Sequence, residues 1–181
     1  MTEISITGIF VLERDIERFK PDFVLSITDR DGCDQEIALD VLAKAQVPYH
    51  HMGFYDVPRL LNGCVPPSLP DMIEMMAVLD NELPDAPERL LVHCHAGVSR
   101  SPAVALIALA HLSARMGETS EEDGRRIAQQ VFDAQPMSKP NKRILALAQQ
   151  LFGDMGDAMV REGIMLRETC DYSKVAANDI W

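Results

Sequence analysis

The sequence predicts a single α/β domain with a central, mostly parallel sheet of about four to five strands, flanked by helices on both faces. Apolar β-branched runs alternate with segments of helical spacing in the first half of the chain, and helices dominate the rest. A chain of 181 residues suits one domain with a sizeable core. Because no repeat, low-complexity segment or second domain is visible, we expect residues 1–181 to form one domain.

The N-terminal segments alternate between strand and helix. Residues 4–12 predict one strand or a short hairpin with a turn or bulge at Gly8. A short helix over residues 13–20 is stopped by Pro21. Residues 22–28 form a buried strand that ends in the turn-forming cluster Asp29-Arg30-Asp31-Gly32.

A helix, an edge strand and a long loop follow. Residues 34–46 carry an apolar stripe at helical spacing, formed by Ile37, Val41, Leu42 and Ala45. Pro48 places the strand over residues 47–52 at a sheet edge or marks its first residues. Two glycines and three prolines make residues 53–67 an irregular loop.

The C-terminal half is mainly helical. Ser68 and Asp71 resemble a capping box that begins a helix ended by Pro84, with the apolar stripe Leu69, Met72, Ile73, Met76 and Leu79. Residues 89–93 form the central strand, and residues 101–115 are apolar almost all round, which predicts a buried helix. Further helices are expected over residues 120–134 and about 140–151, with a weaker one over 157–168.

Composition and charge exclude several classes of function. Hydrophobic residues make up 47% and charged residues 25%, as in ordinary globular proteins. The formal net charge of −11 argues against nucleic acid and anionic membrane as main partners. There is no transmembrane-length apolar run and no signal-peptide pattern. We therefore expect a cytoplasmic protein with reduced thiols at its four scattered cysteines, Cys33, Cys64, Cys94 and Cys170.

The stretch LLVHCHAGVSRSP, from Leu90 to Pro102, carries the chemistry. An apolar strand stops at Cys94, and Arg100 begins a helix whose unpaired amides and dipole favour an anion. The loop between them can turn its amides inward, and Gly97 permits the positive φ that this needs. Arg100 adds a planar fork for two oxyanion oxygens, and the same features favour the thiolate of Cys94. The residues predict phosphoryl transfer to Cys94 followed by hydrolysis.

A metal site is the weaker interpretation of His93-Cys94-His95. Along a strand the two histidines point to one side and the cysteine to the other, so the three side chains do not converge on one ion. We expect neither a metal nor a cofactor.

The segment His93-Cys94-His95-Ala96-Gly97-Val98-Ser99-Arg100-Ser101 resembles the His-Cys-x5-Arg-Ser/Thr motif of the cysteine-dependent protein tyrosine phosphatases. Its Ala-Gly-x-Ser-Arg-Ser version is most similar to the dual-specificity group, including small bacterial members. The resemblance covers roughly residues 22–151, and the tail over 153–181 has no assigned role. It implies a phosphate-binding loop between the central strand and the buried helix. It also implies hydrolysis of phosphate monoesters, mainly protein phosphotyrosine with tolerance of phosphoserine and phosphothreonine.

The resemblance also implies roles for individual residues. Cys94 is the expected nucleophile, Arg100 the phosphate-binding arginine, Ser101 the hydroxyl that assists thiolate departure, and His93 the ring that holds the loop and tunes the thiol. The expected phosphate-binding residues are Arg100 together with His95, Ala96, Gly97, Val98 and Ser99. Pro140-Asn141 resembles a pair that opens the family's last helix, where Asn141 would support the loop.

The general acid is expected on a loop upstream of the nucleophile. Asp56 lies 38 residues before Cys94, in the irregular loop after the edge strand. The loops after Thr28, Met52 and His93 all leave the carboxyl edge of the sheet, which would bring Asp29, Asp56 and Cys94 together. Asp29 and Asp31 therefore remain alternatives to Asp56.

Substrates and competing functions stay open at this point. The loop carries no lysine, which disfavours phosphoinositides, and Tyr49, Phe54 and Tyr55 are candidates for the pocket wall. Phosphorylated proteins or small phosphomonoesters are the expected partners. The alternatives are a non-catalytic phosphoprotein-binding module or, on a similar loop, a sulfurtransferase or arsenate reductase.

Overall fold

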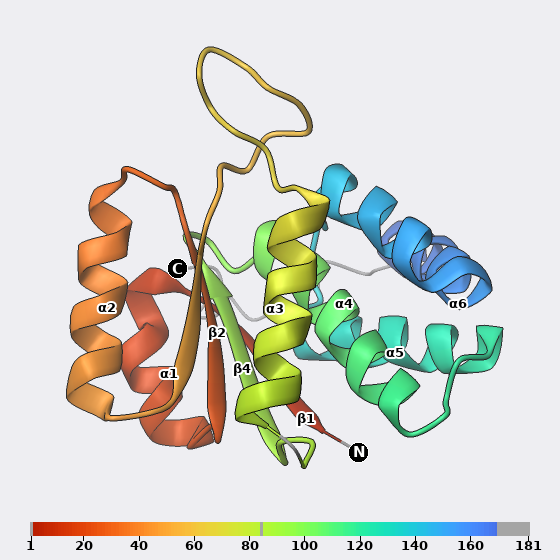
Figure 1. The fold of residues 1–181 in the computed structure, drawn as a ribbon, viewed down its shortest axis with the longest axis horizontal. Helices are drawn as coiled ribbons and strands as arrows, with labels where there is room; N and C mark the ends of the chain where they lie inside the picture. The colour runs from red at the N-terminus through yellow and green to blue at the C-terminus, as the bar shows by residue number, and fades with distance from the viewer. Residues whose placement is uncertain (1, 84, 170–181) are drawn as a thin grey trace.

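The computed structural model describes residues 2–83 and 85–169, with side chains to residue 166. In this part of the chain four strands form one parallel sheet in the order β1-β4-β2-β3 (Figure 1). The strands are β1 (Glu3–Gly8), β2 (Phe23–Thr28), β3 (Tyr49–Gly53) and β4 (Arg89–Cys94). The predicted fold class is therefore confirmed, with 89–93 central and the strand after Pro48 at an edge.

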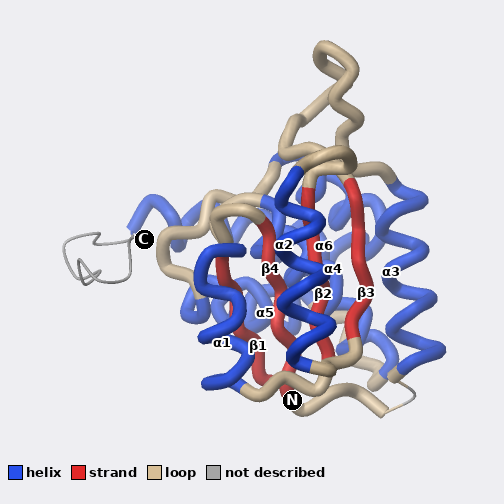
Figure 2. Tube along the Cα trace, turned by 90° about the vertical axis from the view of Figure 1, so that its left-hand side faces the viewer, coloured by secondary structure: helices blue, strands red, loops and turns tan. Residues whose placement is uncertain are grey.

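Helices cover both faces of this sheet (Figures 1 and 2). On one face lie α1 (Leu12–Phe19) and α2 (Cys33–Ala45). The other face carries α3 (Leu69–Glu82), α4 (Arg100–Arg115) and α5 (Glu121–Ala134), and α6 (Lys142–Thr169) packs against α4 and α5. Among the described residues, no helix is both long enough and apolar enough to cross a membrane.

Alternating side chains along the central strands create two cores. Leu91 of β4 packs with residues of α1 and α2, while Leu90 and Val92 join the larger core against α3, α4 and α5. Cys94 continues the Leu90 side of the strand, and buried α4 directly follows the loop after it. The thiol therefore stands where the larger core reaches the carboxyl edge of the sheet.

The strand expected over residues 4–12 is shorter than predicted. The strand ends at Gly8, and the chain continues as the short 3-10 helix η1 (Ile9–Val11) into α1, so no hairpin forms. The amide of Ile9 donates to the carbonyl of His95 over 3.0 Å, which turns the chain away from the sheet. Gly8 marks this turn.

Two predicted apolar stripes are partly wrong. Ile37 and Ile73 are exposed, at 44% and 49% of their surface. Helix α2 buries Ala38 and Leu42, and α3 buries Met72, Met75 and Leu79, so Ala38 and Met75 pack in the core where Ile37 and Ile73 were expected. The predicted start of α3 is confirmed: Asp71 accepts from the Ser68 amide over 2.7 Å, and Ser68 accepts from the Asp71 amide in return.

The two C-terminal helices predicted near 140–151 and 157–168 are joined. Gly153 has a φ of 51° and bends α6, and the helix resumes without an intervening loop. Helix α5 packs closely on the part of α6 that follows Gly153. This packing depends on Gly124, because a Cβ there would lie 2.4 Å from the Met155 carbonyl oxygen. Cys170 and the tail from residue 170 lie outside the described residues.

Candidate active site

Cys94 ends β4 with its thiol buried at the N-terminus of α4. The amide of Gly97 donates to Cys94 Sγ over 3.3 Å, and the Ser101 hydroxyl lies 3.2 Å from the same sulfur. Both groups can donate a hydrogen bond to a thiolate, and α4 adds its positive dipole end. The sulfur thus faces two hydrogen-bond donors and the N-terminus of a helix.

The loop after Cys94 is shaped by its contact with the end of β1. Gly97 has a φ of 74°, and a Cβ there would lie 2.6 Å from the carbonyl carbon of Thr7. A Cβ at Gly8 would lie 3.1 Å from the His95 carbonyl oxygen. Only glycine satisfies both the positive φ and the close approach at residue 97. The sequence predicted the positive φ, but nothing in it revealed that β1 supports the loop.

Arg100 is buried, with one side of its guanidinium fixed by neighbouring loops. Its Nη1 donates to Asp29 Oδ1 over 2.7 Å and to the carbonyl oxygen of Phe54 over 2.9 Å. Its Nε is also buried but has no hydrogen-bond partner among the described residues. A buried donor without a partner is costly, so Nε is a donor that the described residues leave unsatisfied.

Asp56 is fixed by the phosphate loop and by the start of α6. Its Oδ1 accepts from the Ser99 hydroxyl over 2.8 Å and from Asn141 Nδ2 over 2.7 Å. Its Oδ2 accepts from none of the described residues. The carboxyl group is therefore oriented by one oxygen, while the other remains available for a proton.

Asn141 links three parts of the site. Its side-chain Oδ1 accepts from the amides of Arg143 and Ile144 and caps α6, while its own amide donates to the Ser99 carbonyl over 3.1 Å. Since Nδ2 also contacts Asp56, one asparagine joins the helix, the loop and the candidate acid. This geometry agrees with the supporting position expected for Asn141.

His93 faces the opposite side of β4 from Cys94. Its Nε2 lies 2.9 Å from the Ser26 hydroxyl, within the sheet. Burial lowers the pKa of His93 to about 4, so the ring is neutral at neutral pH. It can fix the end of β4, but it supplies no positive charge to the thiol under these conditions.

His95 is half-exposed on the loop. Its Nδ1 lies 2.6 Å from Asp34 Oδ2, at the N-terminus of α2, and its ring meets the edge of Phe10 at 5.4 Å between centroids. Asp34 was not among the residues predicted from the sequence. Its only signal was its position in the first turn after the carboxyl end of β2.

These side chains surround a cavity of about 460 Å³ at the carboxyl edge of the sheet. The lining residues are Asp29, Asp34, Tyr55, Asp56, Val57, Cys94, His95, Ala96, Val98, Ser99 and Arg100. Gly97, Ser101 and Asn141 are hydrogen-bonded to lining residues, His93 contacts Ser26 instead, and neither His93 nor Asp31 is part of the lining. The topology therefore brings Asp29, Asp56 and Cys94 to one site.

Only one of the three expected wall aromatics lines the cavity. Tyr55 does so, but Phe54 is fully buried in the core and Tyr49 begins β3 at the opposite edge of the sheet. Tyr49 lies away from the cavity because it begins β3, at the amino ends of the parallel strands, whereas the cavity lies at their carboxyl ends. Within the described ranges, no group of three or more His, Cys, Asp or Glu is arranged to hold a metal ion.

Comparison with known proteins identifies the fold. No protein-family model and no curated protein matches the sequence. The Yvh1 phosphatase domain from Chaetomium thermophilum superposes with a TM-score of 0.58 at 20% identity, covering 88% of this chain and 95% of that one. DUSP15 gives 0.55 at 16% identity over 93% of both chains, and human DUSP28 gives 0.53 at 16% over 88% and 94%. The chain thus has the fold of dual-specificity and protein tyrosine phosphatases.

Proposed function

We propose that this protein is a phosphatase that hydrolyses phosphate monoesters through a cysteinyl-phosphate intermediate on Cys94. The observation that carries the proposal is the geometry of Arg100. Asp29 and Phe54 hold its Nη1, its side chain lines the cavity that Cys94 also lines, and its Nε is buried without a partner among the described residues. A phosphoryl group bound there would satisfy Nε and meet the loop amides above the sulfur.

In the first step the Cys94 thiolate attacks phosphorus in line with the leaving oxygen. The S–P bond forms as the P–O bond breaks, and negative charge develops on the leaving alkoxide or phenolate. Asp56 would donate its proton from Oδ2, because Oδ1 already accepts from Ser99 and Asn141. Asp29 is the weaker candidate, since it accepts a hydrogen bond from Arg100.

In the second step water attacks the phosphocysteine, and the Asp56 carboxylate accepts a proton from that water. The new P–O bond forms as the S–P bond breaks, releasing phosphate and the thiolate. Ser101 would donate a hydrogen bond to the departing sulfur, from its present 3.2 Å separation. The alcohol or phenol leaves after the first step and phosphate after the second, when Asp56 again carries its proton and Cys94 is again a thiolate.

The expected substrates are phosphorylated proteins or small phosphomonoesters, with phosphotyrosine first and phosphoserine or phosphothreonine tolerated. Tyr55 at the wall supports the choice of an aromatic ester, and the loop residues 95–99 carry no lysine for a polyphosphorylated ligand. We also infer action in the cytoplasm, in keeping with free thiols at Cys33, Cys64 and Cys94.

Turnover of p-nitrophenyl phosphate in the presence of EDTA tests the proposal. Wild-type protein should release phosphate, Cys94→Ser should not, and Cys33→Ser should behave as wild type because Cys33 is exposed at the start of α2. Full activity in Cys94→Ser would contradict the proposal. Tight phosphopeptide binding without turnover in the wild type would instead identify a binding module, and thiosulfate:cyanide transfer would identify a sulfurtransferase.

A further inference from the structure

We infer that the enzyme prefers phosphopeptides with basic residues beside the phosphorylated residue. The inference rests on the proposed function and concerns the charge of the same cavity. Three of the residues lining it are aspartates, Asp29, Asp34 and Asp56, whereas its cationic groups are Arg100 and, when protonated, His95. A bound phosphate brings further negative charge to this cavity.

The cations present are already engaged. Arg100 donates to Asp29, and His95 lies 2.6 Å from Asp34. The buried Nε of Arg100 has no partner among the described residues, so it is a donor left for a bound anion. When phosphate binds there, one guanidinium is shared between a carboxylate and a dianion, so negative charge exceeds positive charge around the substrate. Cationic groups on the substrate itself would restore the balance.

The mouth of the cavity adds a further carboxylate. Asp31 is exposed in the turn after β2. Partial desolvation, followed by the nearby charge of Asp31, raises the pKa of the Tyr55 hydroxyl above its usual value. Asp31 itself does not line the cavity, but it is exposed two residues after Asp29 and lies near Tyr55, and both of these residues line it, so we place Asp31 beside the mouth of the cavity.

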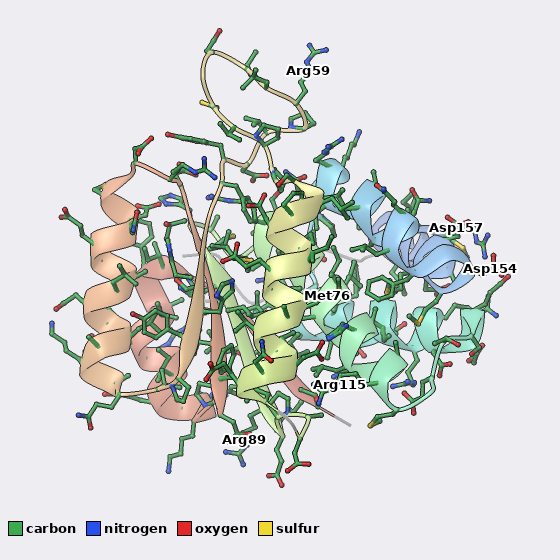
Figure 3. All side chains as sticks on the ribbon, viewed as in Figure 1. Arg59, Met76, Arg89, Arg115, Asp154 and Asp157 are labelled. Atoms are coloured by element: carbon green, nitrogen blue, oxygen red, sulfur yellow. The ribbon has the colours of Figure 1, made fainter. Side chains whose placement is uncertain are left out.

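Neighbouring basic side chains point elsewhere. Arg30 donates from Nε to the Gly53 carbonyl over 3.3 Å and lines a separate cavity of about 260 Å³ with Asp71 and Glu74. Arg59 lies on the loop that projects from the body of the domain (Figure 3). Lys139 approaches the phosphate loop through its backbone amide, which donates to the Val98 carbonyl, and its side chain is not part of the cavity lining. These basic groups therefore do not neutralise Asp31 or the aspartates that line the cavity.

Long-range electrostatics act in the same direction. The chain carries a formal net charge of −11, which repels acidic peptides before they reach the cavity and attracts basic ones. Both effects depend on ionic strength because the rim is exposed to solvent. A preference caused by these charges should therefore weaken as salt is added.

The experiment compares two phosphotyrosine peptides that differ only in having arginine or glutamate on both sides of the phosphotyrosine. The kcat/KM of the full chain is measured for each at low and high salt, and the Kd of each is measured with Cys94→Ser. The rim variant is Asp31→Asn. The control is Asp40→Asn, which removes the same charge from an exposed residue of α2 that pairs with Lys44.

We expect kcat/KM to favour the basic peptide by at least about fivefold at low salt and by about twofold or less at high salt. Asp31→Asn should reduce the low-salt ratio by about twofold, whereas Asp40→Asn should leave both this ratio and p-nitrophenyl phosphate turnover as they are. Equal rates, or a preference for the acidic peptide, would overturn this inference while leaving Cys94-dependent turnover intact. Loss of all turnover in the wild type would overturn the proposed function as well.

Discussion

Asn141 Nδ2 lies 2.7 Å from Asp56 Oδ1, although the two residues are 85 positions apart in the sequence. The contact joins the loop after β3 to the first turn of α6. The Ser99 hydroxyl donates to the same oxygen, so the candidate acid is fixed relative to the phosphate loop rather than by its own loop alone. Catalysis should depend on this orientation.

Asn141→Ser tests this contact while keeping an oxygen that can cap α6. The variant loses the donor to Asp56, so we expect kcat to fall by about tenfold for aryl phosphates with poor leaving groups and less for good ones. Thermal unfolding should show a small change, whereas Asn141→Ala should lower the Tm further. An Asn141→Ser enzyme with wild-type rates across the leaving-group series would show that Asp56 needs no such support.

The choice among the aspartates can be made by leaving-group dependence. Asp56→Asn should slow the first step by about 10²-fold or more for poor leaving groups, because no proton is donated. Asp29→Asn should instead raise KM and weaken inhibition by vanadate, because Arg100 loses the carboxylate that fixes its Nη1. Asp31→Asn serves as the control and should change neither the leaving-group dependence nor the KM and the inhibition by vanadate. If Asp29→Asn reproduces the leaving-group effect, Asp29 is the acid.

Gly97→Ala should disrupt the phosphate loop. The new Cβ would lie 2.6 Å from the Thr7 carbonyl carbon at a φ of 74°, so the loop or β1 must move. We expect loss of vanadate inhibition and a decrease in unfolding free energy of about 2 kcal/mol or more. Gly63→Ala is the matched control, since it has a φ of 84° but no atom within 4 Å of the added Cβ. Activity retained in Gly97→Ala would show that the loop does not need this close contact.

The buried His93 predicts that acid destabilises the fold. Its pKa is about 4 in the folded protein and near 6.5 when unfolded, so the unfolded chain binds more protons between these values. The contribution of neutral His93 to the free energy of unfolding is therefore complete above pH 6.5. It decreases as the pH falls toward 4, by about 2–3 kcal/mol at pH 4.5. Urea unfolding at about pH 7 and pH 4.5 should show this decrease, and His93→Asn should show less of it. An equal decrease in the variant would assign the effect to other groups.

Local patterns in the sequence predicted most of the fold. The apolar run ending at Cys94, the box of Ser68 and Asp71, and Pro48 before an edge strand are signals within a few residues, and each element forms as expected. The errors arise from packing between distant segments. Ile37 and Ile73 lie on exposed faces because the faces that α2 and α3 bury are set by their neighbours.

In the site, too, local sequence signals were sufficient for some features, whereas contacts between distant residues could not be predicted. The carboxyl ends of parallel strands lie at one edge of a sheet, so the sequence alone predicts that Asp29, Asp56 and Cys94 lie close together. The pairing of Asp29 with Arg100 and of Asp34 with His95 depends on tertiary contacts at the sheet edge, and that of Ser26 with His93 depends on the register of β2 and β4 within the sheet. Such pairs leave no periodic signal, so a single sequence cannot reveal them.

The most direct test of the central claim is to stop the reaction rapidly and determine the mass and site of modification of the protein. After mixing with p-nitrophenyl phosphate, whose good leaving group needs little protonation, the wild-type chain and, more strongly, Asp56→Asn should carry one phosphoryl group on Cys94, because the variant lacks the base for the second step. Cys33→Ser should be labelled like the wild type. Turnover without phosphocysteine in either protein, or phosphoryl groups on another residue, would contradict the mechanism.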